Sequence, residues 1–184
     1  MAEVISRQSL ARGDFLSLQR IRWRDSQGRE GAWESAQRNN AVPAVLIIAW
    51  LHPSDRLLLV RQYRPPAEGA VIEFPAGILD GGESAGQGAL RELLEETGHH
   101  GRVLRVYPAA YNTPGLSGDC THLAMVEVDE TDPRNDSPVP RHEPGEEMNV
   151  VLVARGGVAG FLASEAAQGA LFDSKVVAYL AALS

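Results

Sequence analysis

Residues 77–99 constrain this chain more than any other part of it. They read GILDGGESAGQGALRELLEETGH. Gly77 is followed by Glu83 and then by a run of defined residue types: Arg91-Glu92-Leu93-Leu94-Glu95-Glu96-Thr97-Gly98. Seven fixed residue types at about 6% frequency each would match by chance on the order of once in a million chains. The spacing therefore reflects a specific structure rather than composition.

The same stretch predicts a glycine-rich loop followed by a helix. Gly81-Gly82 supply backbone freedom in the loop, Ser84 can cap the start of a helix, and Gly98 is a natural stop. Apolar residues repeat with helical spacing and form one buried stripe: Leu90, Leu93, Leu94 and Thr97. The charged residues fall on the opposite arc: Arg91, Glu92, Glu95 and Glu96. Glu92 and Glu96 lie one turn apart on the same face.

Carboxylates packed this closely repel one another. One interpretation is a solvated acidic face, relieved by the Arg91–Glu95 pair one turn apart. The other is a cation site, because Mg²⁺ is usually held by a few carboxylates together with substrate phosphates. The complete spacing favours the cation site.

The stretch resembles the box of the Nudix hydrolases, G-x5-E-x7-R-E-U-x-E-E-x-G-U, where U is a bulky apolar residue. Those enzymes cleave nucleoside diphosphates linked to another group. Each defined position matches except the last, where His99 replaces the apolar residue; we expect His99 and His100 on the surface. The resemblance implies Mg²⁺, with Mn²⁺ as a substitute, and metal ligands at Glu92 and Glu96. It implies that Glu95 joins them, that Arg91 orients the glutamates, and that Glu83 is a weaker ligand candidate.

Length and charge bound the remaining possibilities. The chain has 184 residues and a net charge of −7, which suits one sizeable core plus a small extra element and disfavours an extended nucleic-acid surface. The one cysteine, Cys120, has no partner for an internal disulfide, so we expect a small buried residue and a cytoplasmic location. The longest apolar run, residues 41–51, is too short to span a bilayer and predicts a core strand, so no membrane partner is expected.

Patterning along the chain predicts two domains, a β domain at residues 1–40 and a Nudix domain at 41–184. Alternation predicts N-terminal strands near 15–23 and 31–38. Further strands are expected near 42–51, 56–64, 102–111, 120–128 and 148–154, with helices near 84–97, 157–168 and 173–183. Residues 129–147 are expected to form a long acidic loop. The fold class is therefore α/β, an α/β/α sandwich with a mixed β-sheet plus a small N-terminal antiparallel β domain, in agreement with the Nudix fold.

The flanks of the box resemble one branch of the family, the ADP-sugar (ADP-ribose) pyrophosphatases. The segments that carry this resemblance are Trp33-Glu34-Ser35-Ala36-Gln37-Arg38, Leu59-Val60-Arg61-Gln62-Tyr63-Arg64-Pro65-Pro66, Ile72-Glu73-Phe74-Pro75-Ala76-Gly77 and Thr113-Pro114-Gly115-Leu116-Ser117. Pro114, about sixteen residues beyond the box, marks that branch. The likeness covers most of residues 15–150.

This second resemblance implies a substrate site. Trp33 and Phe15 would sandwich the adenine, drawing on both subunits of a homodimer with exchanged N-terminal domains, because flat aromatic pairs suit a purine. Arg38 and Arg64 would bind phosphate oxygens through the guanidinium fork. Ala76 would offer its backbone carbonyl to a metal, and Glu73 would contact substrate or bound water. The plain alternatives are core aromatics, surface arginines and a structural Glu73.

A general base for the attacking water is expected on the loop before the last strand. The resemblance favours Glu146, with Glu143 and Glu147 as open alternatives. Closure of such a loop over the substrate would exclude bulk water.

The resulting hypothesis is Mg²⁺-dependent hydrolysis of the diphosphate of ADP-ribose or a related ADP-sugar to AMP and a sugar phosphate. The partner is a small nucleoside diphosphate sugar. Three alternatives stay open at this point. The first is the same chemistry on another substrate such as GDP-mannose, and the second is a sensor that binds ADP-ribose without turnover. The third, removal of oxidised nucleoside triphosphates, would not need the N-terminal domain.

Overall fold

The structure is a computed structural model that describes residues 1–40, 42–142 and 147–183. It divides into two compact units, Met1–Ala44 with Ala109–Thr121, and Val45–Pro108 with His122–Ser184. The boundary at residue 40 stays a prediction. The grouping of residues 109–121 with the N-terminal strands depends on contacts between distant segments, which a reading along the chain does not supply.

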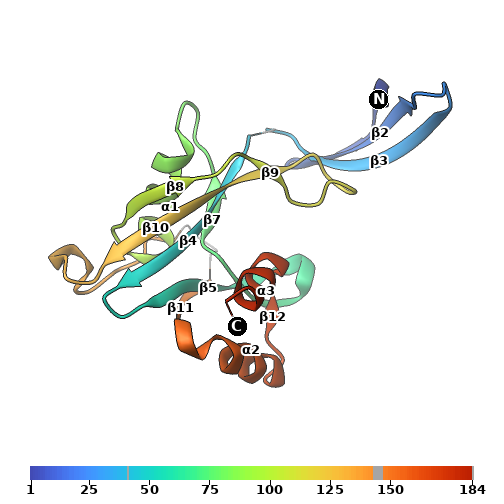
Figure 1. The fold of residues 1–184 in the computed structure, drawn as a ribbon. Coiled ribbons are helices and arrows are strands. Elements are labelled where there is room, and N and C mark those ends of the chain that lie inside the picture. Colours follow the sequence, from blue (N-terminus) through green and yellow to red (C-terminus); the bar gives the residue numbers. More distant parts are fainter. Residues whose placement is uncertain (41, 143–146, 184) are drawn as a thin grey trace. The chain divides into compact units, whose positions relative to one another are not determined.

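Figure 1 shows the elements of the described chain. In chain order they are β1 (Glu3–Arg12), β2 (Leu16–Arg24), β3 (Glu30–Arg38), β4 (Ala44–His52), β5 (Arg56–Arg64), η1 (Pro65–Ala67), β6 (Gly69–Glu73), β7 (Ala76–Ile78), α1 (Ala85–Thr97), β8 (Arg102–Val106), β9 (Ala110–Tyr111), β10 (Cys120–Asp129), η2 (Pro133–Asn135), β11 (Met148–Ala154), η3 (Arg155–Gly157), α2 (Val158–Ala167), β12 (Leu171–Phe172) and α3 (Ser174–Ala181).

The first unit contains an antiparallel sheet with the strand order β1-β2-β3. β2 and β3 confirm the two predicted N-terminal strands, whereas β1 was not expected. All ten residues of β1 are exposed, so it lacks the alternation that marks a half-buried strand. The loop at 113–118 is tied to β3, since Ala36 N donates to Leu116 O at 2.9 Å and Ser35 Oγ donates to the same oxygen at 3.0 Å.

The second unit is built on a mixed sheet, as expected. Its strands follow the order β12-β6-β5-β4-β10-β8, with β11 also paired to β5 and β7 to β4. β12 runs parallel to β6, whereas β5 runs antiparallel to β4, β6 and β11. Short strands β6, β7 and β12 escaped prediction because two to five residues carry too little pattern to separate strand from loop.

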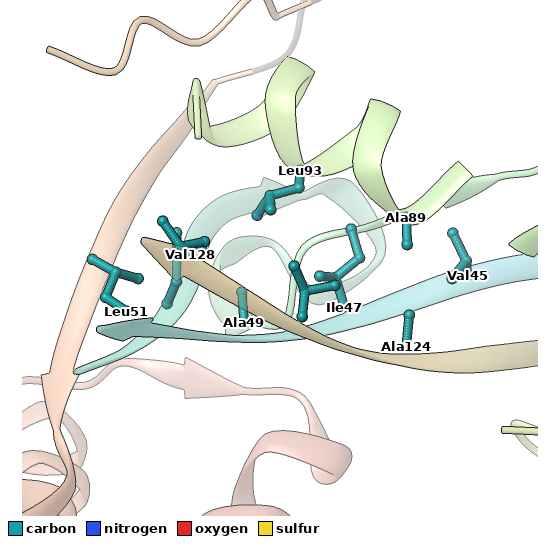
Figure 2. Close-up of a cluster of buried hydrophobic side chains, with 10 residues drawn as sticks. Val45, Ile47, Ala49, Leu51, Ala89, Leu93, Ala124 and Val128 are labelled. Carbon is teal, nitrogen blue, oxygen red and sulfur yellow. The ribbon is translucent and has the colours of Figure 1, made fainter. Parts of the chain in front are cut away.

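The two faces of this sheet carry separate apolar clusters. Figure 2 shows one face, where Ala89 and Leu93 of α1 pack on Val45 and Ile47 of β4 and on strand β10. On the other face, residues of β4 and β5 pack against α2 and α3; the fully or nearly fully buried members include Leu46, Ile48, Leu57, Val158, Val176 and Leu180. Helices therefore cover both faces, which confirms the α/β/α prediction.

Three expectations about local structure were wrong. The strand predicted at 102–111 is broken into β8 and β9, because Pro108 lies between them and cannot donate to a ladder. His99, expected on the surface, is only 6% exposed. Cys120, expected to be buried, is half-buried. Among the described residues, no helix combines the length and apolar character that a membrane crossing requires.

Candidate active site

Helix α1 begins and ends as its sequence predicted. Ser84 and Gln87 form a reciprocal capping box, in which Gln87 N donates to Ser84 Oγ at 3.3 Å and Ser84 N donates to Gln87 Oε1 at 3.0 Å. Gly98 closes the helix with a φ of 74°, and its N–H donates to Leu94 O at 2.9 Å. These two ends set the register in which Arg91, Glu92, Glu95 and Glu96 leave the helix.

His99 follows this end and is accommodated by local polar contacts. Its Nδ1 lies 3.0 Å from Thr97 O and 3.1 Å from Thr97 Oγ1. Burial lowers the pKa of the imidazole below its ordinary value of 6.5, so the neutral ring is favoured in the folded chain. A neutral, hydrogen-bonded imidazole can occupy a position where the family pattern has an apolar side chain.

All the N–H donors of the Arg91 guanidinium bond to acceptors within this protein. Nε and Nη2 each donate to Glu83 at 3.0 Å, and Nη2 also donates to Ile78 O at 3.1 Å. Nη1 donates to Glu92 at 2.8 Å and to Glu95 at 3.0 Å. A guanidinium has five N–H donors, so none is left over for a substrate phosphate. Arg91 therefore positions the glutamates.

This arrangement also affects the protonation of the groups involved. The hydrogen bond from Arg91 lowers the pKa of Glu83, with burial opposing it. The hydrogen bond to Glu83 is the largest of several contacts that raise the pKa of Arg91. Both groups stay ionised at neutral pH, and the charge of Arg91 offsets the repulsion among the three glutamates that it contacts.

Glu92 and Glu96 both lie against the backbone of β7. A side chain on Gly77 would overlap the Glu92 carboxylate, which explains why glycine stands at that position. Ala76 N donates to Glu96 Oε2 at 3.1 Å, and Glu96 is only 8% exposed. The structure therefore brings Glu92, Glu96 and the Ala76 backbone together, with Glu95 more exposed beside them.

These groups fit a divalent cation by their chemistry. Two carboxylates and a nearby backbone segment provide the oxygen donors that hard cations prefer. In the part of the chain that the structure describes, no three His, Cys, Asp or Glu side chains converge as a ready cage. A cation here would thus depend on further oxygens, and substrate phosphates supply these in Mg²⁺ sites of this kind.

Arg64 and Glu73 lie on neighbouring strands of the same unit. Arg64 Nε donates to Glu73 Oε1 at 2.8 Å, and the Glu73 side chain is largely buried while Arg64 is half-exposed. Burial raises the pKa of Glu73, and the hydrogen bond from Arg64 opposes that rise. Arg64 is therefore accessible to an anion but is paired with Glu73 in this structure.

The residues predicted to supply the base are only partly described. Glu143 and Glu146 lie outside the described residues. Glu147 is described and exposed, and its carbonyl accepts from Tyr63 N at 3.4 Å. The preceding residues are attached to the end of α1, since Arg141 N donates to Glu95 O at 2.7 Å and His142 Nε2 lies 3.0 Å from Glu96 O.

In the first unit, Trp33 and Pro114 line one pocket of about 670 Å³. Trp33 is 53% exposed, and its Nε1 donates to Gly115 O at 2.8 Å. Because that N–H is already used, the indole offers a ligand its face rather than a hydrogen bond. The same pocket is lined by residues that were not among the predicted site residues: Arg7, Trp23, Ser35, Gln37 and Tyr111 among them.

The sequence contained an indication that Trp23 lies in the pocket. A Cβ on Gly31 would lie 2.6 Å from the Trp23 ring, so the indole lies close over the β3 backbone. Trp23 pairs with Gly31 across the two strands, next to the Ile21–Trp33 pair on the same face. An aromatic residue opposite a glycine in a predicted hairpin is the pattern that would have placed Trp23 in the pocket.

Phe15 and Arg38 lie at the other end of the same sheet. Trp33 pairs with Ile21, which is six residues beyond Phe15, a separation of about 20 Å along a strand. Phe15 is 82% exposed, and one chain does not bring it to Trp33. Arg38 pairs across the strands with Leu16, and its Nε lies 3.6 Å from Asp119.

Comparisons with known proteins identify the class of this fold and then its family. A solved structure of an ADP compounds hydrolase matches with a TM-score of 0.65, covering 88% of this chain and 82% of that chain at 22% identity, which shows a shared fold. The NUDIX domain model matches residues 41–168. The chain belongs to the Nudix family, as the resemblance of residues 77–99 implied.

Two relatives extend the likeness beyond the box. The ADP-sugar pyrophosphatase of Mus musculus is 34% identical over 188 residues, which cover 98% of this chain and 86% of that protein. The ADP-ribose pyrophosphatase of Saccharomyces cerevisiae is 39% identical over 140 residues, which cover 72% of this chain and 61% of that protein. The chain thus matches less than two thirds of the yeast protein's length.

Proposed function

We propose that this protein hydrolyses the diphosphate of ADP-ribose or a related ADP-sugar to AMP and a sugar phosphate. The observation that carries the proposal is the placement of two glutamates against the Ala76–Gly77 backbone: Glu92 is held there by Arg91, and Glu96 accepts from Ala76 N. The substrate follows from the names of the mouse and yeast relatives, the first of which is similar over almost the whole chain.

The reaction adds one water across the diphosphate. The water oxygen bonds to one phosphorus, the bond from that phosphorus to the bridging oxygen breaks, and the bridging oxygen leaves with the other phosphate. A bound divalent cation, Mg²⁺ or Mn²⁺ as a substitute, would supply neutralisation of charge in the transition state. Glu92, Glu96 and the Ala76 carbonyl would hold it, with Glu95 close by.

The chain's own residues then bind and orient. Arg91 holds Glu92 and Glu95 in place before substrate arrives, so little reorganisation is needed. Arg64 exchanges Glu73 for a substrate phosphate, and Glu73 remains to bind substrate or an ordered water. Arg38 serves a second phosphate oxygen through its exposed guanidinium.

Glu146 is our proposed base for the proton that the water loses. Its neighbour Glu147 is disfavoured by strand alternation. Met148 pairs with Gln62, on the same face of β5 as Val60, whose partner Val150 packs in the cluster beneath α1. Extending the alternation of β11 by one residue would direct the Glu147 side chain to the opposite face. Glu146→Gln and Glu143→Gln test the choice, and we expect only the first to abolish turnover.

We also propose that residues 1–40 form a domain that both binds adenine and holds two subunits together. The exposed apolar residues of the N-terminal sheet, Val4, Ile5, Leu10, Leu16 and Leu18, favour association with a second copy. Since Phe15 and Trp33 are far apart in one chain, we propose that Phe15 of a second subunit completes the stack on Trp33, with Pro114 alongside. Light scattering after size exclusion tests the dimer.

The decisive experiment is product analysis with an equimolar panel of ADP-ribose, ADP-glucose, GDP-mannose, NADH and dGTP in Mg²⁺. AMP and ribose 5-phosphate from ADP-ribose would support the proposal. Release of GMP and mannose 1-phosphate would retain the chemistry with another substrate. Tight binding of ADP-ribose without any turnover would instead indicate a sensor.

A further inference from the structure

Two ion pairs lie side by side at the edge of the second unit. Arg64 of β5 pairs with Glu73 of β6 at 2.8 Å, and Lys175 near the start of α3 pairs with Asp173 at 2.8 Å. Lys175 is the only lysine in a chain with many arginines. The resemblance to known proteins gave no role to Asp173 or Lys175.

Sheet register brings the two carboxylates together. β12 runs parallel to β6 with Leu171 opposite Val71 and Phe172 opposite Ile72, and Asp173 N donates to Ile72 O at 3.0 Å. Asp173 is the next residue along and has extended backbone angles, so it lies beside Glu73. Laterally paired residues point to the same face of a sheet. Consistent with this, Asp173 and Lys175 both act on Glu73 electrostatically, with opposite sign.

That face is the one covered by α1. Glu73 pairs with Val60 of β5, and Val60 pairs on its other side with Val150, which packs in the cluster beneath α1. Arg64 is on the same face by alternation, four positions beyond Val60. Arg64, Glu73 and Asp173 therefore lie on the face that α1 covers, toward the edge strand β12, and Lys175 reaches Asp173 from α3.

The charge balance depends on Lys175. Arg64, Glu73, Asp173 and Lys175 together are neutral. If Arg64 turns to a substrate phosphate, Lys175 still balances one of the two carboxylates, so only one negative charge is uncompensated. Without Lys175, Glu73 and Asp173 would both attract Arg64, and its release to a phosphate would be opposed by a larger negative charge.

We propose that Lys175 is a positioning residue of the substrate site, which neutralises Asp173 and so leaves Arg64 free to exchange Glu73 for a substrate phosphate. The inference rests on the proposed function and adds a residue from the C-terminal segment to it. Lys175 acts through Arg64 and does not itself contact the reacting atoms.

Kinetics of three variants test this role. We expect Lys175→Met to raise KM for ADP-ribose by about threefold to tenfold, the scale of losing one charge near a partly exposed site, with kcat within about twofold. Lys175→Arg should keep the wild-type KM. The double variant Lys175→Met with Asp173→Asn should return KM toward the wild-type value, because asparagine removes the unpaired charge and still caps α3.

Arg134→Met is the matched control. Arg134 stands two residues after Asp132, which caps η2, and pairs with it at 2.6 Å. This repeats the local geometry of Asp173 and Lys175 away from Glu73, so KM should not change. An unchanged KM in Lys175→Met would overturn the inference. So would a double variant as impaired as the single one, which would indicate a purely structural contact.

A binding measurement separates this inference from the proposed function. Calorimetry with ADP-ribose in EDTA measures binding without hydrolysis. The ratio of Kd between Lys175→Met and wild type should equal the ratio expected for KM, whether or not the protein turns over ADP-ribose in Mg²⁺. Wild type that binds without turnover, with the expected ratio, would support the inference while contradicting the proposed hydrolysis. Equal affinities in a hydrolytically active protein would overturn the inference alone, and absence of both binding and turnover would overturn both.

Discussion

Gly77→Ala is the substitution that most directly tests how the glutamates are positioned. An alanine Cβ there would overlap the Glu92 carboxylate, whose side chain is mostly buried and bonded to Arg91 at 2.8 Å. The carboxylate must therefore move by more than an ångström or leave its rotamer, at a cost of about 0.5–1.5 kcal/mol. The Arg91 contact would be weakened at the same time.

The expected effects on activity and stability differ. A misplacement of about 1 Å in a catalytic constellation can cost about 100-fold in rate, which corresponds to about 2.7 kcal/mol of transition-state stabilisation. The free energy of unfolding should fall by less, because replacing glycine also restricts the unfolded chain by about 0.4–1 kcal/mol and offsets part of the strain. We therefore expect a large loss of kcat/KM with a melting temperature within a few degrees of wild type.

The assay is kcat/KM for ADP-ribose at saturating Mg²⁺, together with thermal unfolding of the same preparations. Gly81→Ala is the control, since a Cβ at that position in the same loop meets no atom within 4 Å. We expect Gly81→Ala to keep wild-type activity. Activity of Gly77→Ala within threefold of wild type would refute the argument that Glu92 must lie against this backbone.

Three further predictions concern single side chains. Glu96→Gln should lose most Mg²⁺-dependent turnover yet keep its fold, since the amide oxygen can still accept from Ala76 N; near-normal turnover would remove Glu96 from the ligand set. Trp33→Ala should weaken ADP-ribose binding by about 1–3 kcal/mol, the scale of a base–aromatic stack, and an unchanged Kd by calorimetry would return Trp33 to a structural role. His99→Leu should remove the loss of folding stability that wild type shows at acidic pH. Burial lowers the His99 pKa in the folded chain, so the unfolded chain binds the extra proton and wild type loses stability as pH falls through 6.5. Urea unfolding at pH 7.5 and 5.5 checks this, and a stability difference between the two proteins that does not change with pH would contradict it.

The fold was predictable where the sequence pattern is long and local. Strands β5 and β11 have the predicted bounds, and α1 begins within a residue of its predicted start, because alternation and caps act within one element. β1 was missed because its exposed residues show no alternation. β6, β7 and β12 were missed because each is too short to show a period, and only their pairing with β5, β4 and β6 defines them.

The candidate site residues likewise divide into those placed by local sequence and those placed by distant segments. All the acceptors of Arg91 lie within residues 78–95, so one stretch of sequence contained the whole arrangement. Trp33, in contrast, is oriented by Gly115, which is 82 residues away. No local pattern relates Trp33 to Gly115, so their contact could only be found from the structure, whereas the pairing of Trp23 with Gly31 lies within one hairpin.

Because local residues act on the diphosphate and distant pairings are expected to select the substrate, chemistry and specificity can change separately in this chain. The groups that act on the diphosphate depend on short-range spacing, so a substitution within residues 77–98 alters the chemistry directly. The groups expected to select the substrate depend on pairings between distant segments, such as Arg64–Glu73 beside Asp173–Lys175, or β3 with the loop at 113–118. Substitutions in β12, α3 or that loop can then change which nucleoside diphosphate sugar is bound and leave hydrolysis intact. For this reason the substrate panel tests a separate question from Gly77→Ala, and each result constrains the protein independently of the other.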